Sequence, residues 1–380
     1  GQEDTLRYDM RLGEHGAKRV QLEITAVKNL VEDAIGGYDV EEYNHILARR
    51  GQLDFDDLQV HALEVLQKHP EVALHYRQQY SHVLVDEYQD INPVQHEILR
   101  MLVAPIEDAT GDEVSVPNFV AVGDDSQSVY GFRGAAPQFL IHFLDEFEDG
   151  ELLKLERNYR STEHILTAGN RIIDNNEDRI PKTMWTDKGM GKEIVFKELP
   201  NEAAEAAFIA GHIEKLLARK RPKIDVTDIA VLYRRHAQSE VIAQALEEAG
   251  IPYWVVADND IGQRKGVHLR TIHSAKGLEW EAVVLAGWND GSVPMFTVNK
   301  DPELLPEERR IAYVGVTRAK RDLLVTVPRV TKTKAGGTMP QQPSRFIEVM
   351  KGGEETEPVR RRSGNNHGGR RYGGSSGRSW

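Results

Sequence analysis

Two adjacent carboxylates, Asp86 and Glu87, stand where an apolar run at 82–86 gives way to polar residues. The run predicts a buried strand, and open parallel sheets bind their ligands at the carboxyl ends of the strands. An aspartate there could hold Mg²⁺, directly or through water, and the glutamate could orient or deprotonate an attacking water. An isolated Asp-Glu pair is more often a solvated acidic loop, so this chemistry needs support from other segments.

A second predicted strand, at 118–123, leads into a polar, glycine-rich turn. Gln127 in this turn could hydrogen-bond a terminal phosphate or the water that attacks it. Tyr130 and Phe132 offer flat faces beside a cation, Arg133, and this combination suits stacking on unpaired bases. Local packing is the alternative for aromatic side chains beside glycine.

A third polar segment follows a predicted strand at 152–156. Ser161 or Thr162 could cap the next helix, because a hydroxyl oxygen accepts hydrogen bonds from the free N–H groups of a helix start. Tyr159 could stack on a purine, and Arg160 at a domain edge could reach a phosphate. A plain surface arginine is the alternative for Arg160.

A fourth segment follows a predicted strand at 267–272. Thr271, His273 and Ser274 are neutral donors near the strand end, and Lys276 adds a positive charge. Such groups hold a phosphodiester backbone without reading its sequence. The His, Asp and Glu spacing around His273 gives no support for a zinc site.

The fifth segment is a predicted helix at 306–321. Helical spacing puts Ile311, Val314 and Arg318 on one stripe, and an arginine that extends an apolar stripe is costly unless it finds an anion. Arg318 is therefore either an arginine finger on a transferring phosphoryl group or the partner of a buried carboxylate. Arg309 lies about 160° from Ile311 around the helix axis and should point away.

The elements that must position these residues fall into two regions with different predicted secondary structure. Residues 1–80 are mainly helical by their spacing, and Leu53-Asp54-Phe55-Asp56-Asp57-Leu58 opens a helix with acids in its first turn. Beyond residue 82, strands alternate with helices, which predicts an α/β architecture with parallel sheets. Besides the runs given above, strands are predicted at 193–198, 228–233, 253–256, 282–287 and 322–327, and helices at 201–219 and 236–249.

Composition sets outer limits on the class of protein. The chain has 380 residues, a net charge of −12 and no cysteine, which excludes a disulfide scaffold, thiolate zinc sites and thiol catalysis. No run approaches the roughly 18 apolar residues of a membrane span. The end of the chain, 351–380, is rich in Gly, Arg and Ser and is predicted to be disordered, as a sequence-neutral arm for nucleic acid or as a solubilising tail.

The five segments, in this order, resemble the motifs of superfamily 1 DNA helicases of the UvrD/PcrA/Rep type. DEYQD resembles their second motif, and the segment that usually precedes it is matched by LDFDDL at 53–58. The full set is DEYQD at 86–90, VGDDSQSVYGFRGA at 122–135, NYRS at 158–161, TIHSAKGLEW at 271–280 and EERRIAYVGVTRAK at 307–320. Jointly these motifs are highly specific, and the resemblance covers roughly residues 50–350.

The resemblance implies a fold and an activity. The fold is two RecA-like domains of the P-loop NTPase type with parallel sheets, the first incomplete at its N-terminus, plus an N-terminal helical region. The expected divisions are a helical region at 1–75, a partial first domain at 76–150, a second domain at 151–350 and a tail at 351–380. The implied activity is ATP- and Mg²⁺-dependent movement along single-stranded DNA, or a duplex with a single-stranded tail, usually 3′→5′ with strand separation, in DNA repair or replication. A cytoplasmic, nucleoid-associated protein without a membrane partner is expected.

The resemblance also implies three groups of site residues. The catalytic group is Asp86, which would bind the metal, with Glu87, Gln127, Arg160 and Arg318. The nucleotide-binding group is Tyr159 against the adenine, with Gly277, and Glu279 near the ribose. The DNA-binding group is Tyr130, Phe132, Arg133, Thr271 and His273.

Two departures from the family pattern shape the expectations. No G-x-x-x-x-G-K-[ST] phosphate loop is present, and the one Gly-Lys pair, Gly191-Lys192, is followed by Glu193. Since the chain starts at Gly1, we expect a missing N-terminal piece, supplied by a separate chain or cut from this one, and poor ATP hydrolysis without it. The alternative is a catalytically inactive DNA-binding or regulatory subunit. The second departure is a short loop at 257–266, where the family usually carries a large helical insertion.

Overall fold

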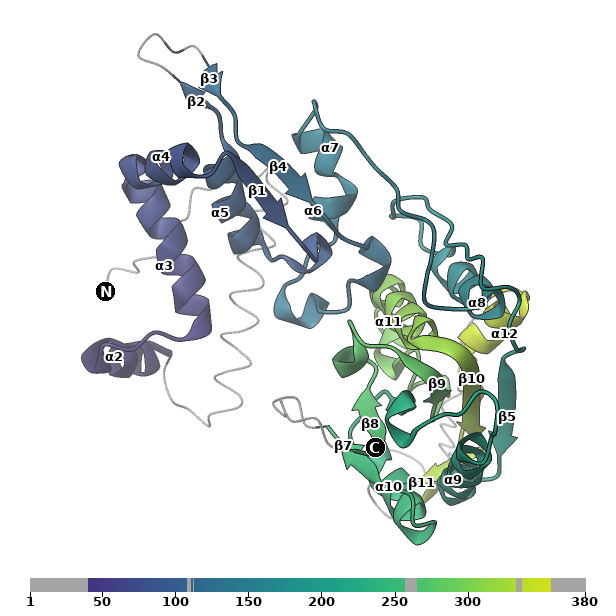
Figure 1. Ribbon diagram of the computed structural model, residues 1–380. Coiled ribbons are helices and arrows are strands. Elements are labelled where there is room, and N and C mark those ends of the chain that lie inside the picture. The colour runs from purple at the N-terminus through teal and green to yellow at the C-terminus, as the bar shows by residue number, and fades with distance from the viewer. Residues whose placement is uncertain (1–39, 108–110, 112, 257–264, 333–336, 357–380) are drawn as a thin grey trace, which may run out of the picture.

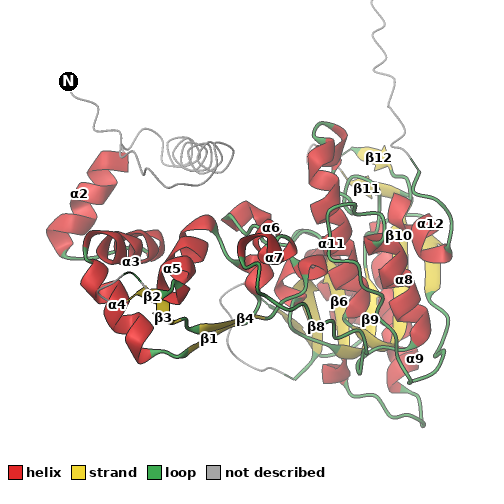
Figure 2. Ribbon diagram, turned by 90° about the horizontal axis from the view of Figure 1, so that it is seen from above, coloured by secondary structure: helices red, strands yellow, loops and turns green. Residues whose placement is uncertain are grey.

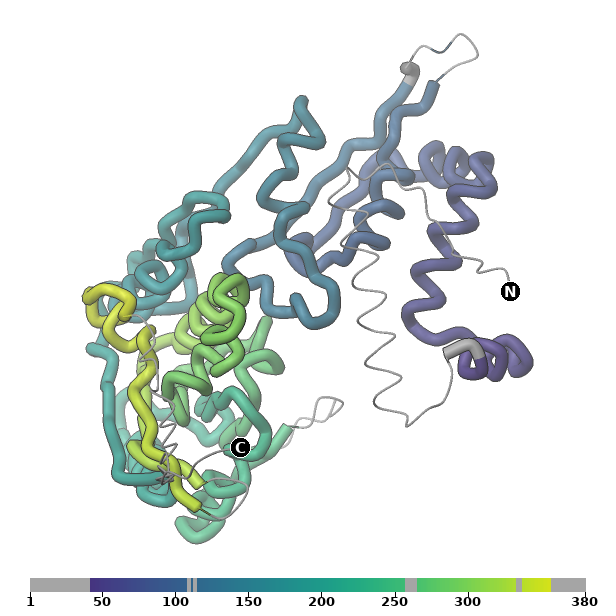
Figure 3. The backbone as a smooth tube through the Cα atoms, turned by 180° about the vertical axis from the view of Figure 1, so that it is seen from behind, coloured from purple at the N-terminus to yellow at the C-terminus, as the bar shows by residue number. Residues whose placement is uncertain are grey.

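The computed structural model describes residues 40–107, 111, 113–256, 265–332 and 337–356 (Figure 1). The apolar periodicity before residue 36, most of the loop at 257–266 and nearly all of the basic tail lie outside the described residues. Within the described ranges, no helix is long and apolar enough to cross a membrane. The remaining chain forms two lobes, which Figures 1 and 3 show side by side.

The first lobe begins with the helices α2 (Val40–Arg50), α3 (Phe55–Lys68) and α4 (Pro70–Gln79). The predicted helix start at 53–58 is confirmed, because Asp54 is the N-cap of α3 and forms a capping box with Asp57. The Asp57 N–H donates to Asp54 Oδ1 at 2.8 Å, and the Asp54 N–H donates to Asp57 Oδ2 at 3.1 Å. These bonds satisfy backbone donors that the first helical turn otherwise leaves free.

The sheet of the first lobe has only two paired parallel strands, β1 (His82–Val85) and β4 (Asn118–Ala121). Around it lie α5 (Pro93–Val103), α6 (Gln138–Ile141), α7 (Phe143–Glu146) and a small hairpin of β2 (Ile106–Glu107) and β3 (Glu113–Ser115). Tyr88 and Leu140 are buried at the centre of this lobe's core. Apolar side chains of the same strands remain exposed, Leu84 by 70% and Val120 by 39%. The sheet is thus covered only in part by the described residues.

The second lobe holds a six-stranded parallel sheet in the order β5-β10-β9-β6-β8-β7. Every residue of the central strand β6 is buried, as expected for a parallel strand covered on both faces. The strands are β5 (Val195–Leu199), β6 (Ile229–Tyr233), β7 (Tyr253–Val255), β8 (Val267–Thr271), β9 (Trp280–Leu285) and β10 (Ala319–Pro328). A hairpin of β11 (Val330–Lys332) and β12 (Thr338–Pro340) follows.

Helices cover both faces of this sheet (Figure 2). The helices α8 (Glu163–Ile173), α11 (Leu305–Thr317) and α12 (Arg345–Lys351) build one core with β9 and β10. The helices α9 (Glu202–Leu217) and α10 (Gln238–Glu248) build a second core on the opposite face. The predicted α/β fold of two RecA-like units is confirmed by this arrangement.

Three predictions about local structure are wrong or only half right. No strand forms at 152–156; this stretch connects the lobes, with Leu153 and Leu155 exposed by 76% and 87%, because no neighbouring strand pairs with it. The helix predicted to reach residue 321 ends at Thr317, because the following residues enter β10. Thr162 is the N-cap residue of α8 but makes no side-chain cap bond.

Candidate functional site

The end of β1 carries a strained backbone at Glu87. This residue has φ of +53°, and no other described residue except glycine has a positive φ. A left-handed conformation at such a residue costs on the order of 1–3 kcal/mol and persists only where the surroundings impose it. The backbone is fixed on either side, since the Glu87 N–H donates to Asp86 Oδ1 at 2.8 Å and the Tyr88 N–H donates to Val122 O at 2.9 Å. The turn therefore presents two exposed carboxylates, as the sequence predicted.

Lys276 from the second lobe lies against these carboxylates. It follows β8, is almost fully buried, and its Nζ lies 3.2 Å from Glu87 Oε2 and pairs with Asp90. Gln89 Nε2 also donates to Glu87 Oε2, at 2.5 Å. Burial raises the pKa of Asp90, and the hydrogen bond and charge of Lys276 oppose that effect. The hypothesis that Lys276 holds a phosphodiester is thus not met here, because its ammonium is engaged between the lobes.

Arg318 and Gln127 meet across the lobes. Arg318 Nη2 donates to Gln127 Oε1 at 3.1 Å, while Gln127 Nε2 donates to Asp124 Oδ2 at 2.7 Å. The arginine is 1% exposed, and it also donates to Val314 O at 3.0 Å, to Leu278 O at 3.2 Å and to the Thr317 hydroxyl at 3.2 Å. Burial, followed by the nearby charge of Arg160, lowers the pKa of Arg318 to about 10.

No carboxylate in the described part of the chain forms an ion pair with Arg318. The structure therefore does not show the second alternative for Arg318, a buried pair with a carboxylate. A buried cation held only by neutral oxygens is costly and gains most from an added anion. The surroundings of Arg318 thus suit the binding of an anionic group.

Arg160 belongs to the same neighbourhood. Its Nε donates to Glu279 Oε2 at 2.5 Å, and its Nη1 donates to Thr317 O at 3.4 Å. Lys320 Nζ lies 2.9 Å from Glu279 Oε1. Hydrogen bonds from Lys320 and Arg160, with their charges, hold the pKa of Glu279 down to about 2. Two arginines, Arg160 and Arg318, thus converge at the end of α11.

Tyr159 and Gly277 are placed at the edge of this cluster. Tyr159 is 69% exposed, and Arg157 lies over its ring at 4.8 Å from the centroid. Gly277 has φ of +78°, which side chains rarely adopt, so glycine is required at this turn. The assignment of these residues and of Glu279 to a nucleotide stays a prediction.

An aromatic surface is shared by the two lobes. The rings of Tyr130 and Phe132 lie 6.1 Å apart, and Phe132 lies edge-on to His273 at 5.8 Å. The Arg133 guanidinium is 5.4 Å from the centroids of both Tyr130 and Phe132. Phe132 is 67% exposed, so a flat face beside a cation is open to solvent. This geometry suits stacking on unpaired bases.

Thr271 does not reach that surface. It is 6% exposed, and its hydroxyl donates to Ser274 Oγ at 3.0 Å and accepts from the Ser274 N–H at 3.2 Å. Its side chain therefore shapes the turn that carries His273. Its prediction as a DNA-binding residue has no support in this placement.

Sequence analysis missed several contacts between the lobes. Lys182, from the loop after α8, pairs with Asp124 at 3.0 Å and with Asp125. Burial acts to raise the pKa of Asp124, but the charge of Lys182 and the hydrogen bond from Gln127 outweigh it, and the pKa is lowered. Two more contacts are Arg310 Nε donating to Ser128 O at 2.7 Å and the Gly131 N–H donating to Glu307 Oε1 at 3.0 Å. No local pattern signals these contacts.

Arg309, predicted to point away from the stripe of Ile311, is held against other segments. Its Nε donates to Glu355 Oε2 at 2.9 Å, and its Nη1 donates to Asn175 O at 3.0 Å. It does lie on a different face from Arg318, but other segments cover that face. Arg309 therefore ties α11 to the ends of two other segments.

The exposed carboxylate of Asp86 fits the binding of a magnesium–nucleotide complex. Among the described residues, no group of three or more His, Asp or Glu is placed to hold a metal by itself. Mg²⁺ usually takes only one or two carboxylates, with phosphates and water as its other ligands. The Asp86 carboxylate is exposed and in no ion pair of the described part, so it remains open for such a role.

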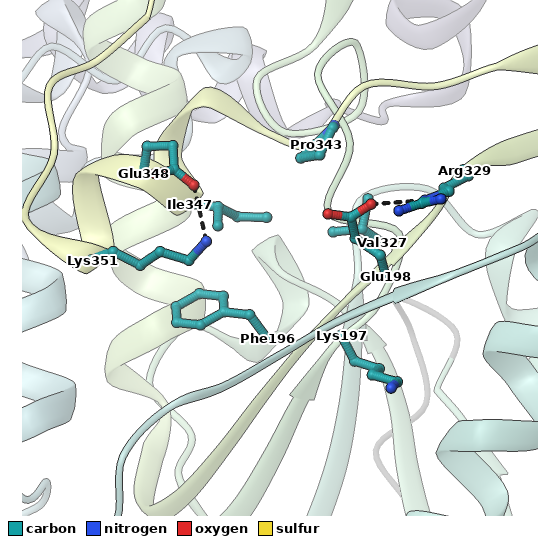
Figure 4. A pocket seen from close by; sticks show the side chains of 9 residues that line it. All are labelled: Phe196, Lys197, Glu198, Val327, Arg329, Pro343, Ile347, Glu348 and Lys351. Carbon is teal, nitrogen blue, oxygen red and sulfur yellow. Dashed lines mark hydrogen bonds and ion pairs between the residues drawn. The ribbon is translucent and has the colours of Figure 1, made fainter.

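A pocket of about 360 Å³ lies elsewhere, between β5, β10 and α12. Four of its charged side chains pair within the pocket, Glu198 with Arg329 and Glu348 with Lys351 (Figure 4). It shares no residue with the carboxylates, arginines or aromatic rings described above. We assign it no role in the chemistry.

Comparisons with known proteins agree with this geometry. The family model of the UvrD/REP helicase N-terminal domain matches residues 18–148. The family model of the UvrD-like helicase C-terminal domain matches 153–267 and 257–329, two pieces that overlap at 257–267. Together the two matches cover most of both lobes, as far as residue 329.

Named relatives show the same likeness. ATP-dependent DNA helicase UvrD2 of Mycobacterium tuberculosis is 29% identical over 412 residues, covering 83% of this chain and 57% of the relative. ATP-dependent DNA helicase UvrD1 of the same species is 37% identical over 275 residues, covering 70% of this chain and 35% of that relative. ATP-dependent DNA helicase PcrA of Leuconostoc citreum is 36% identical over 225 residues, covering 59% of this chain and 28% of that relative. The chain thus spans between about a quarter and three fifths of the length of these relatives.

Proposed function

This chain belongs to the superfamily 1 helicases of the UvrD/PcrA type, and from that premise we propose that it is the C-terminal bulk of an ATP-driven motor on single-stranded DNA. Movement is proposed to run 3′→5′ and to separate the strands of a duplex with a single-stranded tail. We also propose residues 76–150 and 151–350 as its two motor domains. The relatives bear the names of ATP-dependent DNA helicases, which supports this proposal.

The observation that carries the proposal is the buried, carboxylate-free Arg318 in contact with Gln127. In phosphoryl transfer, negative charge spreads over the transferring group, and an arginine can offset it there. Arg160 approaches the same region from the start of the second lobe. The two guanidinium groups would stabilise the charge that develops on the terminal phosphate.

The first lobe would supply the water-activating group. Glu87 would accept the proton of the attacking water, and Gln127 would hold that water or the phosphate through its amide. Asp86 would hold Mg²⁺, which supplies neutralising charge to the phosphates when bound. Since Lys276 and Gln89 already contact Glu87, its carboxylate is oriented before any ligand arrives.

The aromatic surface would hold DNA beside this site. Tyr130 and Phe132 belong to the first lobe and His273 to the second, so a strand stacked there contacts both. Movement of one lobe against the other would then shift the strand. This arrangement links nucleotide chemistry to DNA through the short segment between Gln127 and Phe132.

The exposed apolar side chains on the strands of the first lobe support the proposal that a further segment packs on this sheet. Leu84, Val120 and Val122 are exposed by 70%, 39% and 50%, although apolar strand residues are ordinarily buried. We propose that a segment carrying a phosphate loop, on this protein or on a separate chain, packs on this sheet. It would complete both the core and the nucleotide site.

The chain by itself is expected to hydrolyse ATP poorly. Its sequence has no phosphate loop, whose backbone amides and lysine normally cradle the phosphates. Steady-state hydrolysis, measured with saturating oligo-dT, should stay near the background of a protein-free control. Turnover on the order of 1–100 per second, the range of many phosphoryl-transfer enzymes, would contradict this expectation.

Replacing Phe132 by alanine should weaken binding of single-stranded DNA by about 5- to 150-fold, because stacking contributes roughly 1–3 kcal/mol per base. Fluorescence anisotropy with labelled oligo-dT measures the affinity at a fixed salt concentration. Phe55, which is 85% exposed on α3, is the matched control, and Phe55→Ala should leave the affinity unchanged. Equal effects of the two substitutions would remove the aromatic surface from the DNA site.

A second candidate function is favoured by one observation, the lack of a phosphate loop in this sequence. In that case the chain would be a DNA-binding or regulatory subunit without ATP turnover. It would bind oligo-dT through the same aromatic surface. It would show no ATP hydrolysis even after a phosphate-loop segment is added.

A further inference from the structure

A basic loop at the end of α9 takes no part in any of the steps proposed above. Residues 215–223 carry five cations and no acid, in a chain whose net charge is −12. The five cations that form the basic loop are Lys215, Arg219, Lys220, Arg221 and Lys223. The last three are exposed, and none of them forms an ion pair within the part of the chain that the structure describes.

Two cations share one carboxylate beside the loop. Arg219 Nη1 lies 2.9 Å from Asp322 Oδ2, and Lys192 Nζ lies 2.8 Å from Asp322 Oδ1. Burial, followed by the charge of Arg219, lowers the pKa of His212 nearby, although the charge of Asp322 acts in the opposite direction. The charges of Lys215 and Lys192 also lower this pKa. The surroundings of the loop thus keep an excess of positive charge, which attracts an anionic ligand.

The acids that follow the loop are bonded to the backbone. Asp225 Oδ1 accepts from the Thr227 N–H at 3.2 Å, and Asp228 Oδ2 accepts from the Asp225 N–H at 2.9 Å. These bonds form the capping box of a short 3₁₀ turn, Val226–Asp228, which leads directly into β6. The exposed cations of the loop are therefore left to an external anion.

We propose that the basic loop, with Lys192, is a contact site for the phosphate backbone of double-stranded DNA. Sites for single strands combine cations with aromatic side chains on which bases stack, and residues 215–223 contain no aromatic residue. A duplex keeps its bases inside and presents one negative charge per 1.7 Å or so of its axis. An acidic protein is a poorer fit, because protein interfaces need an apolar centre that a row of charged side chains lacks. The inference rests on the proposed function only for the identity of the ligand as DNA.

The basic loop and the aromatic surface lie at opposite ends of the same sheet. The loop precedes the first residue of β6, whereas His273 follows the last residue of β8, a parallel neighbour of β6. The five residues of β6 extend about 16 Å, which is the length of about five phosphates along one DNA strand. The loop is therefore a second DNA contact, which a duplex can reach while its single-stranded tail lies on the aromatic surface.

The test is equilibrium binding of a short blunt duplex and of oligo-dT by the full chain, measured by anisotropy over a series of salt concentrations. Lys220→Gln, Arg221→Gln and Lys223→Gln are combined in one loop variant. For the duplex, the slope of log affinity against log salt should become shallower by about 3, because each lost phosphate contact removes about 1. The slope for oligo-dT should change little, since the aromatic surface lies at the other end of the sheet.

A matched control removes the same charge elsewhere on the surface. It replaces three cations by glutamine, each paired with a glutamate outside the loop: Lys68, Arg329 and Lys351. This control variant should keep the duplex slope of the unaltered chain. Melting temperatures show whether each variant folds.

A charge-conserving variant tests the chemistry of the contact. It combines Lys220→Arg, Arg221→Lys and Lys223→Arg. Because a phosphate backbone attracts positive charge of either kind, this variant should bind the duplex like the unaltered chain.

Three results would overturn the inference. Equal changes in the loop variant and the control variant would mean that only net charge acts. An unchanged duplex slope in the loop variant would point to an acidic protein as the ligand instead. Equal losses for duplex and oligo-dT would make the loop part of the single-strand site.

Failure of this inference can be told apart from failure of the proposed function. If the unaltered chain binds oligo-dT through Phe132 but binds no duplex, the loop loses its role and the proposed function stands. If Phe132→Ala leaves oligo-dT binding unchanged while the loop variant loses the duplex, the aromatic surface loses its role and the loop keeps its own.

Discussion

Replacing Arg318 by alanine is expected to slow ATP hydrolysis by about 10³–10⁵-fold in the protein supplied with a phosphate loop, the range found for arginine fingers. The affinity for single-stranded DNA should change little, because Arg318 contacts Gln127, the Thr317 hydroxyl and backbone carbonyls rather than the aromatic surface. Burial without a carboxylate partner is the physical basis of this expectation. The measurements are steady-state hydrolysis with saturating oligo-dT and DNA binding by anisotropy.

The controls must separate chemistry from folding. Arg309 cannot serve, since it bonds Glu355 and Asn175. Arg329 is a better match, because its side chain is 70% exposed and, among the residues that the structure describes, forms an ion pair with Glu198 alone, so Arg329→Ala should change stability by less than about 0.5 kcal/mol. Arg318→Lys keeps a positive charge in the same volume but loses the planar fork of donors. A folded Arg318→Lys variant with normal turnover, or equal losses for Arg318→Ala and Arg329→Ala, would contradict the assignment.

Replacing Glu87 by glutamine is expected to lower turnover by about 10²–10⁴-fold in the same protein while leaving nucleotide binding intact. Glutamine keeps the shape of the side chain and its contact with Gln89, but it cannot accept a proton. Single-turnover hydrolysis and equilibrium binding of ATP measure the two effects separately. The left-handed backbone at Glu87 does not depend on the side-chain charge, so the fold should persist.

Glu198→Gln is the matched control for Glu87→Gln. Glu198 is half exposed and lies on β5, where its carboxylate pairs with Arg329 far from the other candidate residues. This variant should hydrolyse ATP like the unaltered protein. Normal turnover by Glu87→Gln would show that the proton acceptor lies elsewhere.

The order of strands and helices in the second lobe could be predicted because most strands there contain a short apolar run. Strand β6 is an example, since all of its residues are buried and its sequence carries no polar residue. The same rule failed at 152–156, where Leu-Leu-Lys-Leu-Glu has a composition close to that of β5 but is largely exposed between the lobes. Composition cannot tell these cases apart, because burial depends on partners distant in the sequence.

In the candidate site, too, some features could be predicted from the sequence and others could not. Helical spacing placed Arg318 on the buried stripe of α11, and its burial confirms that prediction. Spacing also placed Arg309 on another face, but it could not foresee that Glu355, from the segment after α12, covers that face. Lys182 carries no motif signal at all, yet it neutralises the Asp124 carboxylate that holds Gln127. Contacts of this kind arise from tertiary packing and need the structure.

The contacts between the lobes explain how two separate sets of motifs act together. Lys276 reaches Glu87 and Asp90, and Arg318 reaches Gln127, so cations of the second lobe meet polar groups of the first. An anionic ligand between them would compete for the same cations. Nucleotide binding and release would therefore alter the contacts that hold the lobes together.

The most direct test of the central claim is ATP hydrolysis by this chain joined to a phosphate-loop segment, measured with and without oligo-dT. The account predicts turnover on the order of 1–100 per second that depends on the DNA, while the chain alone stays near background. Strand separation on a duplex with a 3′ single-stranded tail should accompany it. A joined protein that folds and binds oligo-dT but hydrolyses no ATP would contradict the account and support a regulatory, DNA-binding role instead.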